Sequence, residues 1–370
     1  MESEAYQNIV NEITRLSAYE MHRVQDFITN IFLEAEDGYV EETRFADGIE
    51  CPHCGAKGKG VTRNGKAPNG KPRFRCAHCG KTFSATTNRV TYHSKKTFSV
   101  WKKYIACFLN GDTVKVAAAK CEINPKTAWR WRIKICDSLQ IIMEQVKIEG
   151  VAEADETYFP VSFKGHRRTK DGKSTMPCKA KKRGWSCERD VEDANERYKR
   201  GLSEWQVCVA CAVSTNGMSV AKVTGVGTGS YAGIDAAIGD HIVEGSVLCT
   251  DGGRPYARIA RERGFERVKV EPKHHVKGVY GIQHINNYHA RMKHFMMIHE
   301  GVATKHLNSY LVWFNFARYA KEQGGEKMRI LMEHIVKAKC WTRVVDISNR
   351  PDIPYINERV RRASFDRKVA

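Results

Sequence analysis

GVAEADETYF, residues 150–159, and SVLCTDGG, residues 246–253, are two apolar strand-like runs that each lead into an aspartate. We therefore expect Asp155 and Asp251 to stand at the ends of strands. A carboxylate in such a run is costly to bury without a partner. Two carboxylates far apart in sequence, each at a strand end, suggest one shared metal site.

The sequence between and around these runs alternates between strand-like and helix-like patterns. Residues 205–215 and 218–226 predict two more strands, joined by a turn at Asn216–Gly217. Three hairpin-linked strands followed by alternating helices and strands predict a mixed sheet flanked by helices. This α/β order resembles the ribonuclease H-like fold, in which the first and fourth strands are neighbours. Asp155 and Asp251 would then meet at one sheet edge and could hold two Mg²⁺ ions.

Two CxxC motifs, Cys51-Pro-His-Cys54 and Cys76-Ala-His-Cys79, are each followed by a glycine, which permits the positive φ of such turns. Four thiolates at this spacing suit tetrahedral Zn²⁺. The histidines inside the motifs are interpreted as spacers, because the four thiolates complete the shell. A redox-active pair is the alternative, and two matched motifs disfavour it.

The segment between the motifs, VTRNGKAPNGKPRFRC, predicts a hairpin with turn signals at Asn64–Gly65 and Asn69–Gly70. A third CxxC, Cys208-Val-Ala-Cys211, lies in an apolar run with no following glycine, and we interpret it as strand core. The other cysteines among the thirteen stand singly in apolar or helical runs. This usage is typical of small buried residues in a reducing cytoplasm.

Residues 98–110 have the apolar spacing of a helix, which Gly111–Asp112 ends. Thr113 can cap a second helix, and after a short turn we expect Thr127 to begin a third. Helix, short turn and basic helix is the helix-turn-helix layout, whose second helix enters the major groove of DNA. The residues expected to contact DNA are Arg130, Arg132 and Lys134. A helical hairpin with its tryptophans in the core is the alternative.

The 370 residues carry a formal net charge of +19, which favours a polyanionic partner, most simply double-stranded DNA. A basic surface without a nucleic-acid ligand and an anionic membrane are the alternatives. No run of 18 uncharged apolar residues exists, so we expect no membrane span. The polar, acidic N-terminus does not fit a secretory signal. We expect a cytoplasmic, nucleoid-associated protein.

These patterns predict five regions. They are an N-terminal helical region at 1–45, a zinc ribbon at 46–92, a helix-turn-helix at 93–140, the catalytic domain at 149–325, and a basic C-terminal helix or arm at 326–370.

The chain resembles the insertion-sequence transposases of the DDE superfamily, in the ISXO2-like group with an N-terminal zinc ribbon. The likeness covers about residues 46 to 320. The residues that carry it are the four motif cysteines, Asp155-Glu-Thr-Tyr158, Thr250-Asp-Gly252 and the helical run INNYHARMK at 285–293. The run GVATKHLNSYLVWF at 301–314 also looks like the C-terminal helix of that group.

Most members of that superfamily have a third acidic residue, whereas some members of this group have Asn followed seven residues later by Lys. By that pattern the catalytic residues are Asp155, Asp251, Asn286 and Lys293. The two aspartates would hold the catalytic Mg²⁺ or Mn²⁺, and Cys51, Cys54, Cys76 and Cys79 the structural Zn²⁺. Seven residues are nearly two helical turns, so Asn286 and Lys293 would share one face.

Several assignments near this helix stay open. Asn286 could be a helix N-cap, and Asn287 could replace it if the register differs by one. His289 could reach the same site or be a core or surface histidine. Glu156 should face away from Asp155 in a strand. Weaker candidates for the site are Glu271, His274 and His275.

The resemblance implies a transposase that binds terminal inverted repeats, cuts phosphodiester bonds and joins the freed 3′-OH to target DNA. It also implies at least a homodimer, because two element ends must be joined. One alternative is a non-catalytic or domesticated DNA-binding regulator with the same zinc ribbon and helix-turn-helix. The other is a ribonuclease H-like nuclease or resolvase, which cuts DNA without joining it.

Overall fold

The structure is a computed structural model of the whole chain, which divides into two compact units. Unit 1 comprises residues 1–107 and 335–341, and unit 2 comprises residues 108–334 and 342–370. The structure describes residues 4–17, 20–21, 38–67, 70–165, 179–181, 184–186, 206–271, 276–322 and 327–351.

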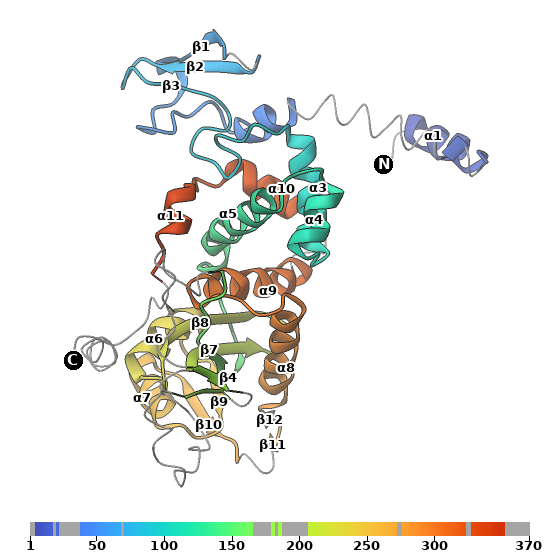
Figure 1. Ribbon diagram of the computed structural model, residues 1–370. Coiled ribbons are helices and arrows are strands. Elements are labelled where there is room, and N and C mark those ends of the chain that lie inside the picture. The colour runs from blue at the N-terminus through green and yellow to red at the C-terminus, as the bar shows by residue number, and fades with distance from the viewer. Residues whose placement is uncertain are drawn as a thin grey trace. The chain divides into compact units, whose positions relative to one another are not determined.

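Unit 1 contains the expected ribbon, a three-stranded antiparallel sheet (Figure 1). Its strands are β1 (Val61–Lys66), β2 (Pro72–Cys76) and β3 (Thr82–Phe83), in that spatial order. Its small core is aromatic, because Phe74 stacks on Phe83 at 5.6 Å between ring centres and meets Phe45 edge-on at 5.0 Å. Helices occur at α1 (Glu4–Thr14) and at residues 38–44, and most of the expected N-terminal helical region between them lies outside the described residues.

The ribbon hairpin reverses later than one of its two turn signals predicted. Asn64–Gly65 lies inside β1, where the pairing with β2 is irregular and Gly65 has φ of 67°. The Gly70 N–H donates to the Ala67 carbonyl and the Ala67 N–H donates to the Lys71 carbonyl, both at 2.8 Å, so the hairpin continues beyond Lys66. Asn-Gly therefore serves as a bulge at its first occurrence, since glycine adopts the left-handed backbone that a bulge needs. Asn69, at the second occurrence, lies outside the described residues.

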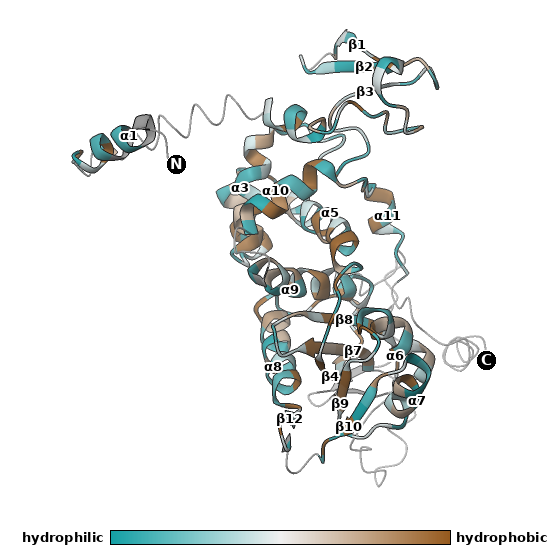
Figure 2. Cartoon of the chain, turned by 180° about the vertical axis from the view of Figure 1, so that it is seen from behind, coloured by the Kyte–Doolittle hydropathy of each residue, from teal (hydrophilic) through white to brown (hydrophobic). Residues whose placement is uncertain are grey.

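Unit 2 contains a five-stranded mixed sheet, which confirms the predicted α/β class. Its strands are β4 (Val151–Pro160), β7 (Gln206–Ser214), β8 (Ser219–Val226), β9 (Val247–Thr250) and β10 (Glu266–Lys269). Their spatial order is β10-β9-β4-β7-β8, with β4, β7 and β8 antiparallel and with β9 parallel to both β4 and β10. β7 is buried along nearly its whole length, so the centre of the sheet is hydrophobic (Figure 2).

Two short hairpins interrupt the order of strands and helices in unit 2. They are β5 (Lys179–Lys181) with β6 (Gly184–Ser186), and β11 (Val276–Lys277) with β12 (Tyr280–Gly281).

Helices lie against the sheet on both sides (Figure 1). One side carries α6 (Tyr231–Ile238) and α7 (Arg254–Arg263), and the other carries α8 (Gln283–Ile298). The Ser230 side chain caps α6, and Gly264 ends α7 at φ of 70°. α9 (Leu307–Glu322) packs along the edge strand β8, where the Asn308 side chain accepts from the Val223 N–H at 2.9 Å.

The helix-turn-helix layout is present at the start of unit 2. α4 (Val114–Lys120) is capped by Thr113 and packs against α5 (Pro125–Met143), while α3 (Phe98–Leu109) precedes them. α5 begins two residues before the predicted Thr127. The earlier start follows from Asn124 and Pro125. Proline suits the first helical position, and Asn124 is the N-cap, whose side chain accepts from the Lys126 N–H at 2.8 Å.

Within the C-terminal region, the described residues form α10 (Lys327–Lys337) and α11 (Val344–Ser348). Residues 352–370 of the expected basic arm lie outside the described residues. Among the helices that the structure describes, none has the length and apolar character needed to cross a membrane.

Candidate active site

The parallel pairing of β4 with β9 sets the two aspartates at one level of the sheet. Val151, Ala152 and Glu153 pair in register with Val247, Leu248 and Cys249. Two residues further along this register, Asp155 comes level with Asp251. β9 ends at Thr250, whereas β4 continues past Asp155 to Pro160 along β7. The prediction that each aspartate ends a strand is therefore correct for Asp251 and wrong for Asp155.

A tight turn holds Asp251. Its Oδ1 accepts from the Gly253 N–H at 3.2 Å, and Gly252 has φ of 108°, a conformation that side chains rarely tolerate. Gly253 is the N-cap of α7. The carboxylate of Asp251 thus lies close to the positive end of the α7 dipole, which favours negative charge there.

The charged form of the Asp155 carboxyl group is disfavoured by its surroundings. Burial and the neighbouring charge of Asp251 raise the pKa of Asp155 to about 6, and Lys293 partly offsets this rise. Glu156 lies on the other face of β4, beside Tyr256 of α7, as strand alternation predicts. Burial and the charge of Asp155 raise the pKa of Glu156 to about 7. Like charges this close favour either a proton or a cation.

One face of α8 is directed at Asp155. Asn286, His289 and Lys293 follow one another at i, i+3 and i+7, and His289 Nδ1 lies 3.9 Å from Asp155 Oδ2. Asn286 and Lys293 are exposed, whereas His289 is buried. Burial and the charge of Lys293 lower the pKa of His289 to about 4, so its ring is neutral at pH 7.

Two of the open assignments are thereby resolved. The N-cap of α8 is Ile282, so Asn286 is the fourth residue of the helix and not its cap. His289 is neither a surface residue nor remote from the carboxylates, because its ring faces Asp155. The i+3 spacing from Asn286 was the signal that pointed to it.

Glu153, which the sequence did not single out, holds the start of α8. Its side chain is 3% exposed. Glu153 Oε1 accepts from His284 Nδ1 at 2.6 Å, and its Oε2 accepts from the Ile285 N–H at 2.9 Å. Glu153 and Asp155 project from the same face of β4, because strand residues alternate. One strand therefore carries both the first aspartate and the cap of the helix that bears Asn286.

The chain that follows β4 holds the other end of α8. Lys164 Nζ donates to three carbonyl oxygens, those of His299, Glu300 and Gly301, at 3.0, 3.0 and 2.9 Å. Next to them, Ser162 and Thr304 exchange two hydrogen bonds. A carboxylate at the N-terminus and an ammonium at the C-terminus both interact favourably with the helix dipole. These contacts favour a single register of α8 against β4.

The oxygen atoms of this cluster suit a hard divalent cation. The charge of Asp251 raises the pKa of Asp155, and a cation between the two carboxylates would remove that repulsion. Asn286 can add an amide oxygen. In the described part of the chain, only the ribbon cysteines bring three or more Cys, His, Asp or Glu ligand atoms within 4.8 Å. A cation at the aspartates would therefore have two carboxylates as its charged ligands.

The ribbon cysteines form a second candidate metal centre. Their four Sγ atoms lie within 4.8 Å of one another, and the Cys51–Cys79 and Cys54–Cys76 pairs lie 3.7 and 3.6 Å apart. A tetrahedral ion with Zn–S bonds of about 2.3 Å requires S···S separations of about 3.8 Å. The Cys79 N–H donates to the Cys76 thiol and contributes most to lowering its pKa to about 7, which favours the thiolate form. The cysteines thus fit Zn²⁺.

Two known family models match parts of this chain. Residues 147–318 match the model of the ISXO2-like transposase domain. This range contains the five-stranded sheet, both aspartates and the whole of α8. The chain carries an ISXO2-like transposase domain. Residues 48–80, with all four ribbon cysteines, match the InsA N-terminal domain, which is a zinc ribbon.

Before the transposase domain, α5 divides the residues expected to contact DNA into two groups. Arg130 and Lys134 are half-exposed, one turn apart. Arg132 is 1% exposed, its Nη2 donates to the Asp112 carbonyl at 2.5 Å, and its guanidinium lies 4.6 Å from the Trp313 ring centre. The expectation that Arg132 contacts DNA is therefore wrong. It is buried because the carbonyl and the ring compensate its loss of water.

Of the weaker candidates, only Glu271 lies among the described residues, and it does not join the site. Glu271 is exposed and pairs with Lys269 at 3.7 Å. His274 and His275 lie outside the described residues, as does most of the basic stretch at 164–184. Cys208 and Cys211 are fully buried in β7, where Cys211 pairs with Asp155, and are core residues as expected.

Proposed function

We propose that the protein binds the terminal inverted repeats of an insertion sequence and catalyses Mg²⁺-dependent cleavage and strand transfer of DNA. The observation that carries this proposal is the β4–β9 register, which brings Asp155 level with Asp251. The facing side of α8 supports it, because both His289 and Lys293 lie close to Asp155.

Asp155 and Asp251 are the residues that would hold Mg²⁺, or Mn²⁺. When bound, the ions activate an attacking oxygen and stabilise the leaving oxygen of a phosphodiester. The protein prepares the pair by burying Asp155 beside a second carboxylate, which makes the bare pair unfavourable at neutral pH.

α8 contributes three different side chains to this site. Lys293 is exposed and close enough to Asp155 to lower its pKa, so it can attract the phosphate of the scissile strand. Asn286 offers an uncharged amide oxygen where related enzymes have a carboxylate. His289 stays neutral at pH 7 and so does not compete with a cation for Asp155.

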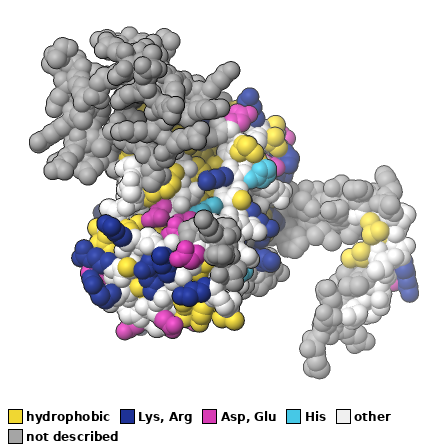
Figure 3. All heavy atoms as spheres, turned by 90° about the horizontal axis from the view of Figure 1, so that it is seen from below, with side chains coloured by type: hydrophobic (Ala, Val, Ile, Leu, Met, Phe, Trp, Pro, Cys, Tyr) yellow, Lys and Arg dark blue, Asp and Glu magenta, His cyan; other side chains and the backbone are white. Residues whose placement is uncertain are grey.

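DNA binding is assigned to the zinc ribbon and to the exposed side of α5. The net charge of +19 supports a DNA partner but does not locate the contact. Lysine and arginine side chains are spread over the face seen in Figure 3, with acidic side chains among them. Arg130 and Lys134 on α5 remain the proposed contacts. We also propose a homodimer on DNA, because two element ends must be joined, and a cytoplasmic location at the nucleoid.

The test uses full-length protein, Mg²⁺ or Mn²⁺ and DNA that carries the flanking repeats of its own locus. Asp155→Ala and Asp251→Ala should each abolish cleavage and strand transfer, while DNA affinity in a gel shift stays within about twofold of wild type. Glu271→Ala is the matched control, because Glu271 is an exposed carboxylate outside the site. Cleavage retained by either aspartate variant would contradict the assignment.

The same assay separates the alternatives. A nuclease or resolvase would give cut ends without joined products. A non-catalytic or domesticated regulator would bind the repeats and cut nothing, in wild type as in the variants.

A further inference from the structure

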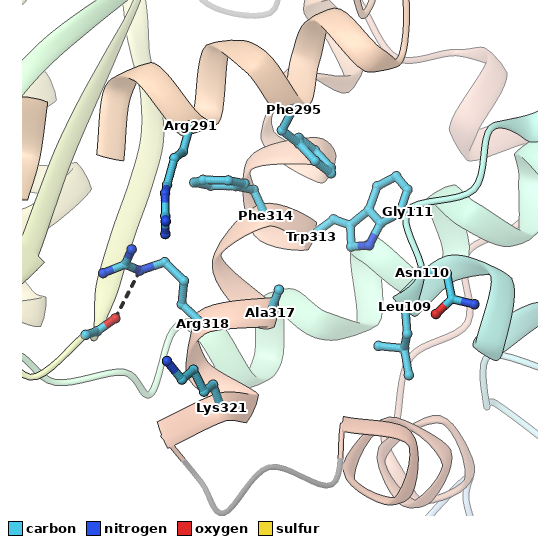
Figure 4. Close-up of a pocket in the computed structure, with 11 residues that line it drawn as sticks. Leu109, Asn110, Gly111, Arg291, Phe295, Trp313, Phe314, Ala317, Arg318 and Lys321 are labelled. Atoms are coloured by element: carbon cyan, nitrogen blue, oxygen red, sulfur yellow. Dashed lines mark hydrogen bonds between the residues drawn. The ribbon is translucent and has the colours of Figure 1, made fainter. Parts of the chain in front are cut away.

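A pocket of about 410 Å³ lies in unit 2 outside the carboxylate site (Figure 4). Four segments form it: the turn after α3, the turn between β7 and β8, α8 and α9. Its described lining residues are Leu109, Asn110, Gly111, Gly217, Arg291, Phe295, Trp313, Phe314, Ala317, Arg318 and Lys321.

The lining of this pocket contains three cations and, among its described residues, no carboxylate. Arg291 comes from α8, and Arg318 and Lys321 are neighbours on α9. Figure 4 shows the ends of Arg291 and Arg318 directed toward one another. Cationic groups that converge in a partly enclosed space repel each other, so an anion bound between them is favoured.

Arg318 is held in place by packing and hydrogen bonds. Its Nε donates to the Gly217 carbonyl at 3.0 Å, and its guanidinium lies 5.6 Å from the Tyr288 ring centre. The Tyr288 hydroxyl donates to Asn315 Oδ1 at 2.7 Å, and the same oxygen accepts from Ser219 at 2.7 Å. A donor that is already oriented loses less conformational freedom on binding.

The opposite wall of the pocket is aromatic, formed by Phe295, Trp313 and Phe314. The cationic side of the pocket suits a phosphate, and the apolar side suits the adjoining sugar of a nucleic-acid backbone. Arg291 precedes Lys293 by two residues, which is about 200° around a helix. The pocket therefore opens on a different side of α8 from the carboxylates.

We propose that this pocket binds a backbone phosphate of the DNA, at a point separate from the active site. Arg291, Arg318 and Lys321 hold the phosphate, and Phe314 packs against the sugar. The ligand rests on the proposed function, in that the protein must bind DNA. The binding itself requires neither the catalytic ions nor cleavage.

The test measures DNA affinity against salt concentration, without added Mg²⁺ or Mn²⁺ and without chelator, by fluorescence anisotropy with full-length protein. Removing one phosphate contact should reduce the slope of log K against log salt by about 0.9. Arg291→Ala and Lys321→Ala should each show this loss, and the double variant about twice as much. Arg318 is left intact, because its contacts with Gly217 and Tyr288 also support the fold.

Arg261→Ala on α7 is the matched control, an exposed arginine that does not line the pocket. Its slope should equal that of wild type, and unchanged thermal unfolding of each variant confirms folding. If Arg291→Ala and Lys321→Ala keep the slope of the control while wild type binds DNA, the pocket assignment is wrong. If wild type shows no salt-dependent DNA binding, the proposed function fails as well.

Discussion

His299 illustrates how a single residue makes stability depend on pH. Its ring stacks on Trp313 at 4.8 Å between ring centres, and its Nε2 is buried with no hydrogen-bond partner in the described structure. Burial, followed by the charges of Arg132 and Lys164, lowers the pKa of His299 to about 4. Because the folded pKa lies below the unfolded value of about 6.5, His299 is neutral in the fold and must charge on acid unfolding.

We predict that this contribution to stability is complete above pH 6.5 and is lost as pH falls from 6.5 toward 4. His299→Phe keeps the aromatic stack but cannot take up a proton. Between pH 7 and pH 4.5, wild type should lose on the order of 2 kcal/mol more unfolding free energy than the variant. Urea denaturation at both pH values measures the difference. His294→Gln, at an exposed position on α8, is the control, and an equal loss in His299→Phe and wild type would refute the prediction.

At the scale of elements, α8 is held at both ends by the chain that carries the first aspartate. Glu153 accepts at its N-terminus and Lys164 donates at its C-terminus. Each charge interacts favourably with the helix dipole and stabilises the helix by about 1 kcal/mol. The spatial relation of Asn286 and Lys293 to Asp155 therefore depends on contacts that touch no substrate.

We predict that Glu153→Gln lowers the rate of cleavage about tenfold, because a neutral cap weakens the contact with α8 by about 1.4 kcal/mol. DNA affinity should be unchanged, since Glu153 is buried. Gel-shift affinity and single-turnover cleavage, measured on one preparation, separate positioning from binding.

Two comparisons make the Glu153→Gln measurement specific. Glu271→Gln removes an exposed carboxylate and should have no effect. Glu153→Asp keeps the charge and should recover part of the rate. A parallel loss of DNA affinity, or full activity in Glu153→Gln, would contradict a positioning role.

α5 shows why charge on a helix is a weak guide to DNA contacts. Arg130 and Lys134 are half-exposed, but Arg132 between them is buried against Trp313 and the Asp112 carbonyl. All three arginine and lysine residues look alike in the sequence. Only the packing of α5 against α9 separates them, because it determines which side of the helix faces water.

At the scale of the whole molecule, the two compact units depend on different forces. The ribbon of unit 1 has only a small aromatic core around Phe74, so it relies on the four thiolates and the metal that they would hold. Unit 2 buries a continuous core around β7 and needs no metal to form its sheet.

We predict that a zinc chelator unfolds the ribbon and leaves the transposase domain folded. Limited proteolysis after chelation should cut within residues 48–83 while a fragment containing 206–322 persists. Cys54→Ser should behave like the chelated wild type. Cys208→Ser, in the core of β7, should not expose the ribbon to protease. Resistance of the ribbon after complete zinc removal would contradict its dependence on the metal.

Features that depend on local spacing could be predicted from the sequence. The CxxC motifs predicted the cysteine cluster, and the order of apolar runs predicted the mixed sheet. The seven-residue interval predicted a shared helix face for Asn286 and Lys293. Each of these follows from backbone periodicity or ligand geometry, which short stretches of sequence already contain.

Features that depend on distant contacts were decided by the tertiary structure. Glu153 meets α8 across more than 130 residues, Arg132 meets Trp313 across about 180, and the basic pocket joins four separate segments. Asp155 proved to lie within β4, because β7 extends that strand beyond the end of β9. The sequence by itself determined which chemical groups this protein has and the local elements that carry them. The fold decided which of those groups meet, because burial and charge depend on neighbours that come from elsewhere in the chain.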